Sequence, residues 1–310
     1  MSQSLMKKSA LRILPGLLCL ALPLSSCSSS KSASTTAMTV TPAEQRYREA
    51  TDRIEKKNYD KAIVILESLM FSTRATELED DVLNAPADSY FKTKEYILAA
   101  DTYRRLLQQT PDSPHARNAQ FQLARSYEKL SPFHELDQEY TVKAISEFTT
   151  YLDQYPSDDS EEAASDADMY KKLMEVDPSN ASYRQKYEAA MAVLSSESPA
   201  RYSSQAIPVL REKLAHNRFS IARQYVRLKK YQAAEIYYDV VINQYADTKW
   251  IEPAWVGKID TEIKRANWFE ARQSIETFQQ LFPGKEKLVE DAAKKVLSHY
   301  SNSRDPKSKE

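Results

Sequence analysis

The sequence predicts an all-α protein, built as an array of about five helical hairpins that ends in a C-terminal capping helix. Three observations favour this fold class. Glycine occurs only three times in 310 residues, which excludes glycine-rich phosphate-binding loops and the common two-residue β-hairpin turns. Alanine and tyrosine recur on one helical face, at spacings of three and four residues. Prolines follow at fixed distances and end helices there, because proline cannot continue the helical hydrogen-bond pattern.

One stretch shows the repeating unit most clearly, from Ala87 to Pro111. Two helices in it carry small and aromatic residues in alternation, at Ala87, Tyr90, Ala99 and Tyr103. The small residues let two helix backbones approach closely, and the tyrosines fill the space beside that contact. The order of positions resembles the tetratricopeptide repeat. One such unit cannot bury its own apolar face, so the resemblance implies flanking copies that stack into a superhelical array.

Flanking copies are present at matching offsets. The small position of the second helix is alanine in all five units: Ala62, Ala99, Ala144, Ala234 and Ala271. The first-helix pair of alanine and tyrosine occurs in three units, as Ala87 with Tyr90, Ala124 with Tyr127, and Ala222 with Tyr225. The first unit has Ala50 with Arg53, and the last has Ile259 with Glu262. We expect end units to differ, because their outer faces meet solvent instead of a neighbour.

These positions predict the helices along the chain. Paired helices are expected over 43–57 and 60–72, within 80–110, over 204–229 and 231–245, and over Trp250–Ala266 and Trp268–Phe282. Pro86 leaves two alternatives, because it either kinks the first helix of the second unit from inside or occupies its favourable first turn.

A capping helix is predicted over 285–300, following Gly284 as a helix C-cap. Its apolar face is expected to consist of Leu288, Val289, Ala292, Val296 and Leu297.

Two segments depart from the repeat. The third unit has a longer turn over 130–140, where Ser131-Pro132 breaks the helix and a lone His134 is expected to be solvated rather than to bind metal. Between Ala144 and Ala234 lie far more residues than one repeat needs. We interpret about 158–203 as an inserted helical hairpin, which begins with an acidic run expected to act as a charged first helical turn rather than a calcium site.

The N-terminal residues 1–26 are predicted to be a lipoprotein signal peptide. Three basic residues precede an apolar segment of about a dozen residues, too short to span a membrane comfortably. The segment ends in Leu24-Ser25-Ser26-Cys27, which resembles a bacterial lipobox. The resemblance implies cleavage before Cys27 and fatty acylation of its thiol and freed amine. The alternative is an ordinary signal peptide that happens to contain a cysteine.

The predicted domain organisation follows. Residues 27–42 comprise the acylated cysteine and a polar, flexible tether, which spans roughly 20 Å as a coil. The repeat domain covers 43–300, and a charged, disordered tail is expected over 301–310. Ser28 stands where an aspartate typically retains lipoproteins in the inner membrane, so this pattern indicates the outer membrane.

The sequence carries no catalytic constellation, and we expect neither enzyme activity nor a cofactor or metal. Its four histidines are scattered through the chain, at His115, His134, His216 and His299. Both cysteines lie in the first thirty residues, and no nucleophile or metal-binding motif occurs. With 43 basic and 44 acidic residues the net charge is −1, which does not suggest a nucleic-acid-binding protein.

The lipobox, the tether and the five repeats together resemble the BamD family, the lipoproteins of the β-barrel assembly machinery. Local sequence adds to this likeness. Ser131-Pro132 with Leu136-Asp137-Gln138 resembles the third repeat of the family, and 210–214 leading to Ala222 and Tyr225 resembles the fourth. Only Cys27 can be carried over as a functional residue.

The resemblance implies a non-catalytic scaffold, lipid-anchored in the outer membrane and facing the periplasm. Its implied partners are the POTRA region of BamA, other lipoproteins of the machinery, and unfolded segments of outer-membrane proteins. We expect 204–300 to face BamA and 43–111 to receive clients. The inserted residues 158–203 depart from the family. The alternative function is a periplasmic scaffold for peptidoglycan or cell-division complexes.

Overall fold

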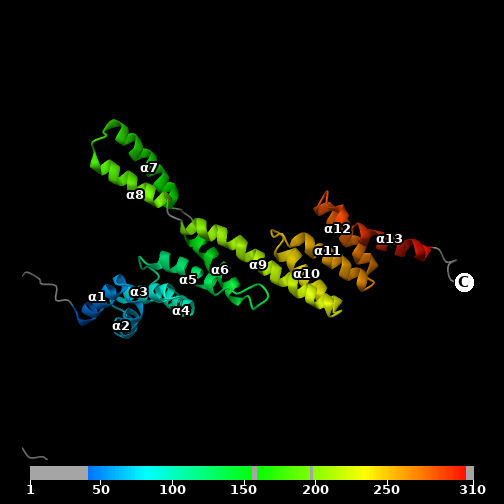
Figure 1. Ribbon diagram of the computed structural model, residues 1–310, viewed down its shortest axis with the longest axis horizontal. Coiled ribbons are helices and arrows are strands. Elements are labelled where there is room, and N and C mark those ends of the chain that lie inside the picture. Colours follow the sequence, from blue (N-terminus) through cyan, green and yellow to red (C-terminus); the bar gives the residue numbers. More distant parts are fainter. Residues whose placement is uncertain (1–40, 156–158, 196–197, 305–310) are drawn as a thin grey trace, which may run out of the picture. The chain divides into compact units, whose positions relative to one another are not determined.

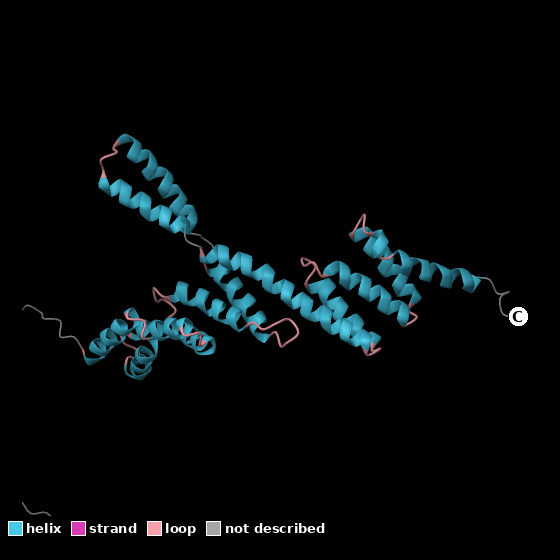
Figure 2. Ribbon diagram, in the orientation of Figure 1, coloured by secondary structure: helices cyan, strands magenta, loops and turns pink. Residues whose placement is uncertain are grey.

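The computed structural model describes residues 41–155, 159–195 and 198–304, and every regular element in these ranges is a helix (Figures 1 and 2). Cys27, the predicted signal peptide and almost all of the predicted tether lie outside the described residues. The confirmed fold class is an all-helical repeat array.

Five hairpins and a C-terminal helix make up the repeats. The hairpins are α1 (Pro42–Glu55) with α2 (Tyr59–Ser72), α3 (Glu79–Lys92) with α4 (Tyr96–Gln109), α5 (Ala116–Leu130) with α6 (Glu139–Gln154), α9 (Pro199–Arg227) with α10 (Tyr231–Gln244), and α11 (Ile251–Lys264) with α12 (Trp268–Leu281). The last helix is α13 (Glu290–Arg304), so it extends four residues into the segment expected as a disordered tail.

The repeated small residues lie where the helices approach most closely. All five second-helix alanines are completely buried, and so are the first-helix alanines Ala50, Ala87, Ala124 and Ala222. Tyr90 and Tyr127 are buried beside these contacts, as is Tyr103 on α4. Where both helices carry alanine, a larger side chain would force the close-packed backbones apart, so the alanine pairs are a packing requirement of these units.

Four of the five hairpin turns use the same C-terminal cap. Lys57, Lys94, Lys229 and Ala266 each adopt a positive φ, between 57° and 68°. The next residue then donates its backbone N–H to a carbonyl five residues earlier, for example from Asn267 to Glu262 at 2.9 Å. This is the Schellman arrangement, in which glycine is usual. None of these four positions is glycine, so the left-handed caps carry no glycine mark in the sequence.

Pro86 lies inside α3, eight residues from its start, which settles the two alternatives in favour of an interior proline. The carbonyl of Val82 therefore lacks its usual N–H partner from within the helix. Pro208 occupies a similar interior place in α9, within the helix that was predicted over 204–229.

The inserted residues form the hairpin of α7 (Asp159–Val176) and α8 (Ala181–Ser195), whose helices pack against each other. α6 packs directly on α9, and one hydrophobic core continues from α3 through α6 to Ala206 and Leu210 of α9. α9 begins at Pro199, about five residues earlier than expected, because Ser198 caps it and proline suits its first turn.

The C-terminal cap differs from its prediction. A short 3₁₀ turn, Glu286–Leu288, precedes α13, so 285–300 is not one helix. Val289 and Val296 are buried as expected, but Leu288 and Leu297 are exposed. For Leu288, the reason is the positive φ of Gly284, 87°, together with the Glu286 carboxylate, which accepts the Gly284 N–H at 2.9 Å. Because of this turn, Leu288 belongs to the 3₁₀ segment before α13 and does not lie on the apolar face of that helix.

Candidate functional site

Few of the residues singled out in the sequence form a chemical site. Cys27 lies outside the described residues, and its lipidation stays a prediction. Across the described ranges, no three side chains of the metal-binding types come together, and no helix is long and apolar enough to cross a membrane. The candidate sites are therefore surfaces and cavities that could bind other proteins.

A cavity of about 450 Å³ lies among the first helices of the three N-terminal hairpins, and we call it the first-helix cavity. Its walls come mainly from α1, α3 and α5, with Tyr59 and Tyr103 contributed by α2 and α4. The lining includes Ile54, Asn84, Asp88, Phe91, Asn118 and Gln122. The cavity thus combines apolar surface with amide and carboxylate groups.

Asp88 organises the polar part of this cavity. The Tyr103 hydroxyl donates to Asp88 Oδ1 at 2.5 Å, and Asn84 Nδ2 donates to Asp88 Oδ2 at 3.2 Å. Burial, and then the charge of Asp88, raise the pKa of Tyr103 well above its usual range, so its hydroxyl remains a donor. Because a carboxylate accepts only, these bonds fix the orientation of the Asn84 amide.

Two acceptor atoms in the cavity lack partners. Asn84 Oδ1 and Gln122 Oε1 are both buried and have no hydrogen-bond partner among the described residues. Native proteins rarely leave buried acceptors unpaired, since each costs about 1–3 kcal/mol. Both side chains line the cavity but the two oxygens themselves have almost no exposed surface, so a ligand that carries N–H groups would pair them only after these amides turn toward it. An extended polypeptide backbone supplies such groups at regular spacing.

The surroundings of the cavity are acidic. Burial, followed by the charges of Asp81, Asp80 and Asp88, raises the pKa of Tyr47 to about 12. Lys92 also lines the cavity and is exposed. The lining itself holds one acidic and one basic side chain, Asp88 and Lys92, and so carries no net charge.

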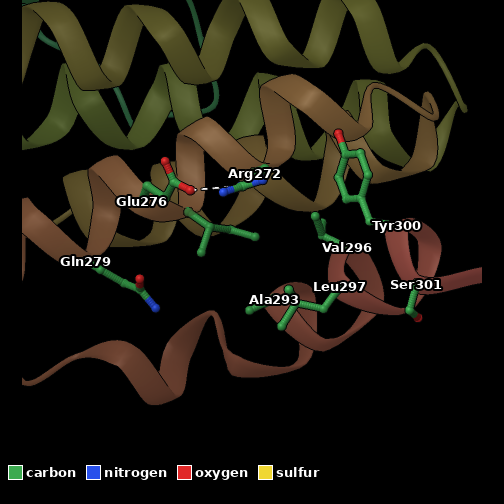
Figure 3. Close-up of a pocket in the computed structure, with 9 residues that line it drawn as sticks. Arg272, Glu276, Gln279, Ala293, Val296, Leu297, Tyr300 and Ser301 are labelled. Carbon is green, nitrogen blue, oxygen red and sulfur yellow. Dashed lines mark hydrogen bonds and ion pairs between the residues drawn. The ribbon is translucent and has the colours of Figure 1, made fainter. Parts of the chain in front are cut away.

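A second cavity, of about 470 Å³, lies between α12 and α13, and we call it the C-terminal groove (Figure 3). Ile275 on α12 and Ala293, Val296 and Leu297 on α13 form its apolar lining. An ion pair between Arg272 and Glu276, at 2.9 Å, borders it, together with Gln279 and Tyr300. Figure 3 shows this pair on α12, across from the side chains of α13.

The structure brings together two histidines that are 82 positions apart. The rings of His134 and His216 stack at a centroid distance of 3.4 Å, and Trp250 stacks on the far face of His216 at 4.0 Å. The expectation of a solvated His134 is therefore wrong. Parallel rings do not direct their nitrogens at one point, so the pair is a packing contact. Burial, then His134 and Lys249, lower the pKa of His216, while Glu135 and Glu212 oppose this effect.

The comparison with curated proteins found no match. Among solved structures, the chain is similar to a tetratricopeptide repeat protein from Parabacteroides merdae, with 14% identity and a TM-score of 0.32, over 82% of this chain and 98% of that one. It is also similar to a thermophilic TPR protein of Thermus thermophilus, with 13% identity and a TM-score of 0.29, over 82% and 99%.

A family match covers the N-terminal part of the repeats. Residues 40–198, just over half of the chain, match YfiO, a family described as an outer membrane lipoprotein. This span contains the three N-terminal repeat hairpins with their buried alanines and the whole first-helix cavity. It also includes the α7–α8 hairpin, which was expected to depart from the family. The chain therefore belongs to the YfiO (BamD) family of outer membrane lipoproteins.

Proposed function

We propose that this protein is a non-catalytic scaffold of the β-barrel assembly machinery, which binds BamA and unfolded segments of outer-membrane proteins. Membership of an outer membrane lipoprotein family supports the location and the scaffold role. The observation that carries the binding role is the first-helix cavity, with its two unpaired amide oxygens beside Asp88.

The first-helix cavity suits a client that has not yet folded. An unfolded segment still has free backbone N–H groups, whereas those of a finished β-barrel are paired between strands. Asn84 and Gln122 would accept such N–H groups, while Ile54 and Phe91 offer apolar contact to alternate side chains. We therefore assign client binding to 43–111 together with α5, slightly beyond the range expected from the sequence.

The C-terminal repeats, about 204–300, are the proposed BamA-facing part. The C-terminal groove supports this assignment, because an apolar lining with a charged and polar border is typical of protein interfaces. The POTRA region of BamA is the proposed occupant, and other lipoproteins of the machinery complete the assembly.

The proposed placement at the membrane depends on Cys27. Acylation there would anchor the chain, since each buried CH₂ of a fatty-acyl chain contributes about 0.8 kcal/mol. The tether over 27–42 would then hold the repeats within about 20 Å of the outer membrane, on its periplasmic side.

Affinity purification of the native lipoprotein from membranes tests the proposed partner. BamA should be retained with the wild-type protein in mild detergent. Retention of peptidoglycan or cell-division enzymes in place of BamA would contradict the proposal and favour the alternative scaffold role.

A further inference from the structure

The loop between α5 and α6, residues 131–138, is held to the repeats by buried amides, and we call it the α5–α6 loop. Asn217 on α9 donates from Nδ2 to the carbonyl of His134 at 2.7 Å. Gln138 donates from Nε2 to the carbonyls of Phe133 and Leu136, both at 2.9 Å. Asn217 and Gln138 are themselves buried. The loop backbone is therefore fixed at three successive points.

Further contacts hold the two ends and the middle of the loop. Lys213 Nζ donates to Ser131 Oγ at 2.8 Å, and Ser131 Oγ lies 2.6 Å from Thr141 Oγ1. In the middle, His134 inserts its ring against His216 on α9. All of these contacts are made by polar groups or by His134, so none of them uses the apolar side chains of the loop tip.

The apolar side chains at the loop tip stay largely exposed, although the Phe133 ring lies against the His134 ring at a centroid distance of 4.0 Å. Phe133 is 64% exposed and Leu136 is 60% exposed. A loop that only connects two helices is usually polar, and adjacent exposed large apolar residues mark interaction sites. Glu135 and Asp137, also exposed, alternate with them along the chain. The loop thus presents two apolar side chains next to two acidic ones.

We propose that Phe133 and Leu136 are the anchor residues of the contact with BamA, and that they enter an apolar pocket with a basic border on its periplasmic region. This inference rests on the proposed function and deepens it. Charge complementarity to Glu135 and Asp137 specifies the basic border. Lys213, His216 and Asn217 tie the loop to α9, which belongs to the part proposed to face BamA.

The fixed backbone explains how two side chains can be sufficient as anchors. Binding residues that are already held in place lose little conformational entropy on association. Interface energy is concentrated in a few aromatic and large apolar residues that become fully desolvated. Phe133 fits this description, since Gln138 holds its carbonyl and the His134 ring supports one side of its ring, which is still mostly exposed.

The test compares BamA retention by full-length variants purified from membranes. Phe133→Ser combined with Leu136→Ser should lower retention by about tenfold or more. Phe71→Ser is the control, because Phe71 is an apolar residue that is even more exposed, at 82%, but lies on α2, outside the proposed BamA-facing part and the lining of the first-helix cavity. Glu135→Lys should also lower retention. Circular dichroism and thermal unfolding should match the wild type in every variant.

The outcomes distinguish a failure of the inference about Phe133 and Leu136 from a failure of the proposed function. Equal BamA retention by the double variant and the wild type would overturn the inference and leave the proposed function standing. Absence of BamA from the wild-type preparation would overturn both. Reduced binding of the double variant to phosphatidylglycerol vesicles, with unchanged BamA retention, would identify the membrane as the occupant and also overturn the inference.

Discussion

Glu262 is the residue that departs most from the repeat, because it occupies the first-helix position where three other units have tyrosine. It is only 2% exposed. One carboxylate oxygen accepts a hydrogen bond from Ser274 Oγ at 3.0 Å, and the other has no partner among the described residues. Burial raises its pKa to about 7, against the opposing effects of Ser274 and Lys258, while Glu235 and Asp239 add to the rise.

This buried acid predicts a pH-dependent stability. The folded state holds the Glu262 proton more tightly than the unfolded state, so its contribution is fully present below pH 4.5 and is lost as pH rises to about 7. Glu262→Gln should raise the free energy of unfolding at pH 8 by about 1–3 kcal/mol. Urea unfolding from pH 5 to pH 8 measures the effect. The exposed Glu270→Gln is the control, and equal pH slopes for wild type and Glu262→Gln would contradict the assignment.

Gln122 gives a prediction that separates binding from stability. Gln122→Met removes an unpaired buried acceptor, so the free energy of unfolding should be unchanged or should rise by about 1 kcal/mol. Affinity for an unfolded outer-membrane protein peptide should fall about five- to thirtyfold, because one N–H of the ligand loses its acceptor. Fluorescence anisotropy with a labelled peptide measures this loss. Gln108→Met, at an exposed position of α4, should bind as the wild type does.

At the residue scale, packing was predictable from the sequence and unpaired groups were not. The buried alanines could be recognised because each repeat imposes the same close approach of backbones. The unpaired oxygens of Asn84 and Gln122 could not be predicted in this way. Whether a side-chain oxygen lacks a hydrogen-bond partner depends on which side chains several other helices place around it. His134 and His216 likewise meet only because the α5–α6 loop lies against α9.

At the element scale, the turn of the last hairpin offers a test of backbone strain. Ala266 adopts a φ of 59°, in the left-handed region that costs a residue with a Cβ about 1 kcal/mol. Ala266→Gly should therefore raise the free energy of unfolding by about 0.5–1 kcal/mol.

The matched control is a second alanine-to-glycine substitution, for which the free energy of unfolding is expected to change in the opposite direction. Ala233→Gly, inside α10, should lower the free energy of unfolding by about 0.5–1 kcal/mol, because glycine loses more entropy in a helix. Thermal unfolding measures both variants. A destabilised Ala266→Gly would show that the cap does not strain the backbone.

Helices were predicted closely wherever periodicity and caps agreed, and less well where a local bond decided the outcome. The hairpins of α1 with α2 and of α11 with α12 begin and end within about two residues of their expected limits. The capping segment was expected as one helix, but Gly284 and Glu286 close a turn that interrupts it. Pro86 and Pro208 lie inside helices because tertiary packing on neighbouring hairpins outweighs one lost hydrogen bond.

At the scale of the whole molecule, the proposed function requires a membrane anchor, a client-binding part and a BamA-facing part in one chain. The anchor is tested by Cys27→Ala, which should release the protein from the membrane fraction or leave the signal peptide uncleaved. Mass spectrometry of the wild-type membrane form should find acyl chains on Cys27, and an unmodified cysteine there would contradict the prediction.

The central claim is that the protein serves the assembly of outer-membrane β-barrels. The most direct measurement follows the level of folded barrels, by their heat-modifiable migration on gels, while the protein is depleted from growing cells. The account predicts that folded barrels fall and their unfolded precursors accumulate, while other lipoproteins remain in the outer membrane. Unchanged barrel levels after complete depletion would contradict the account.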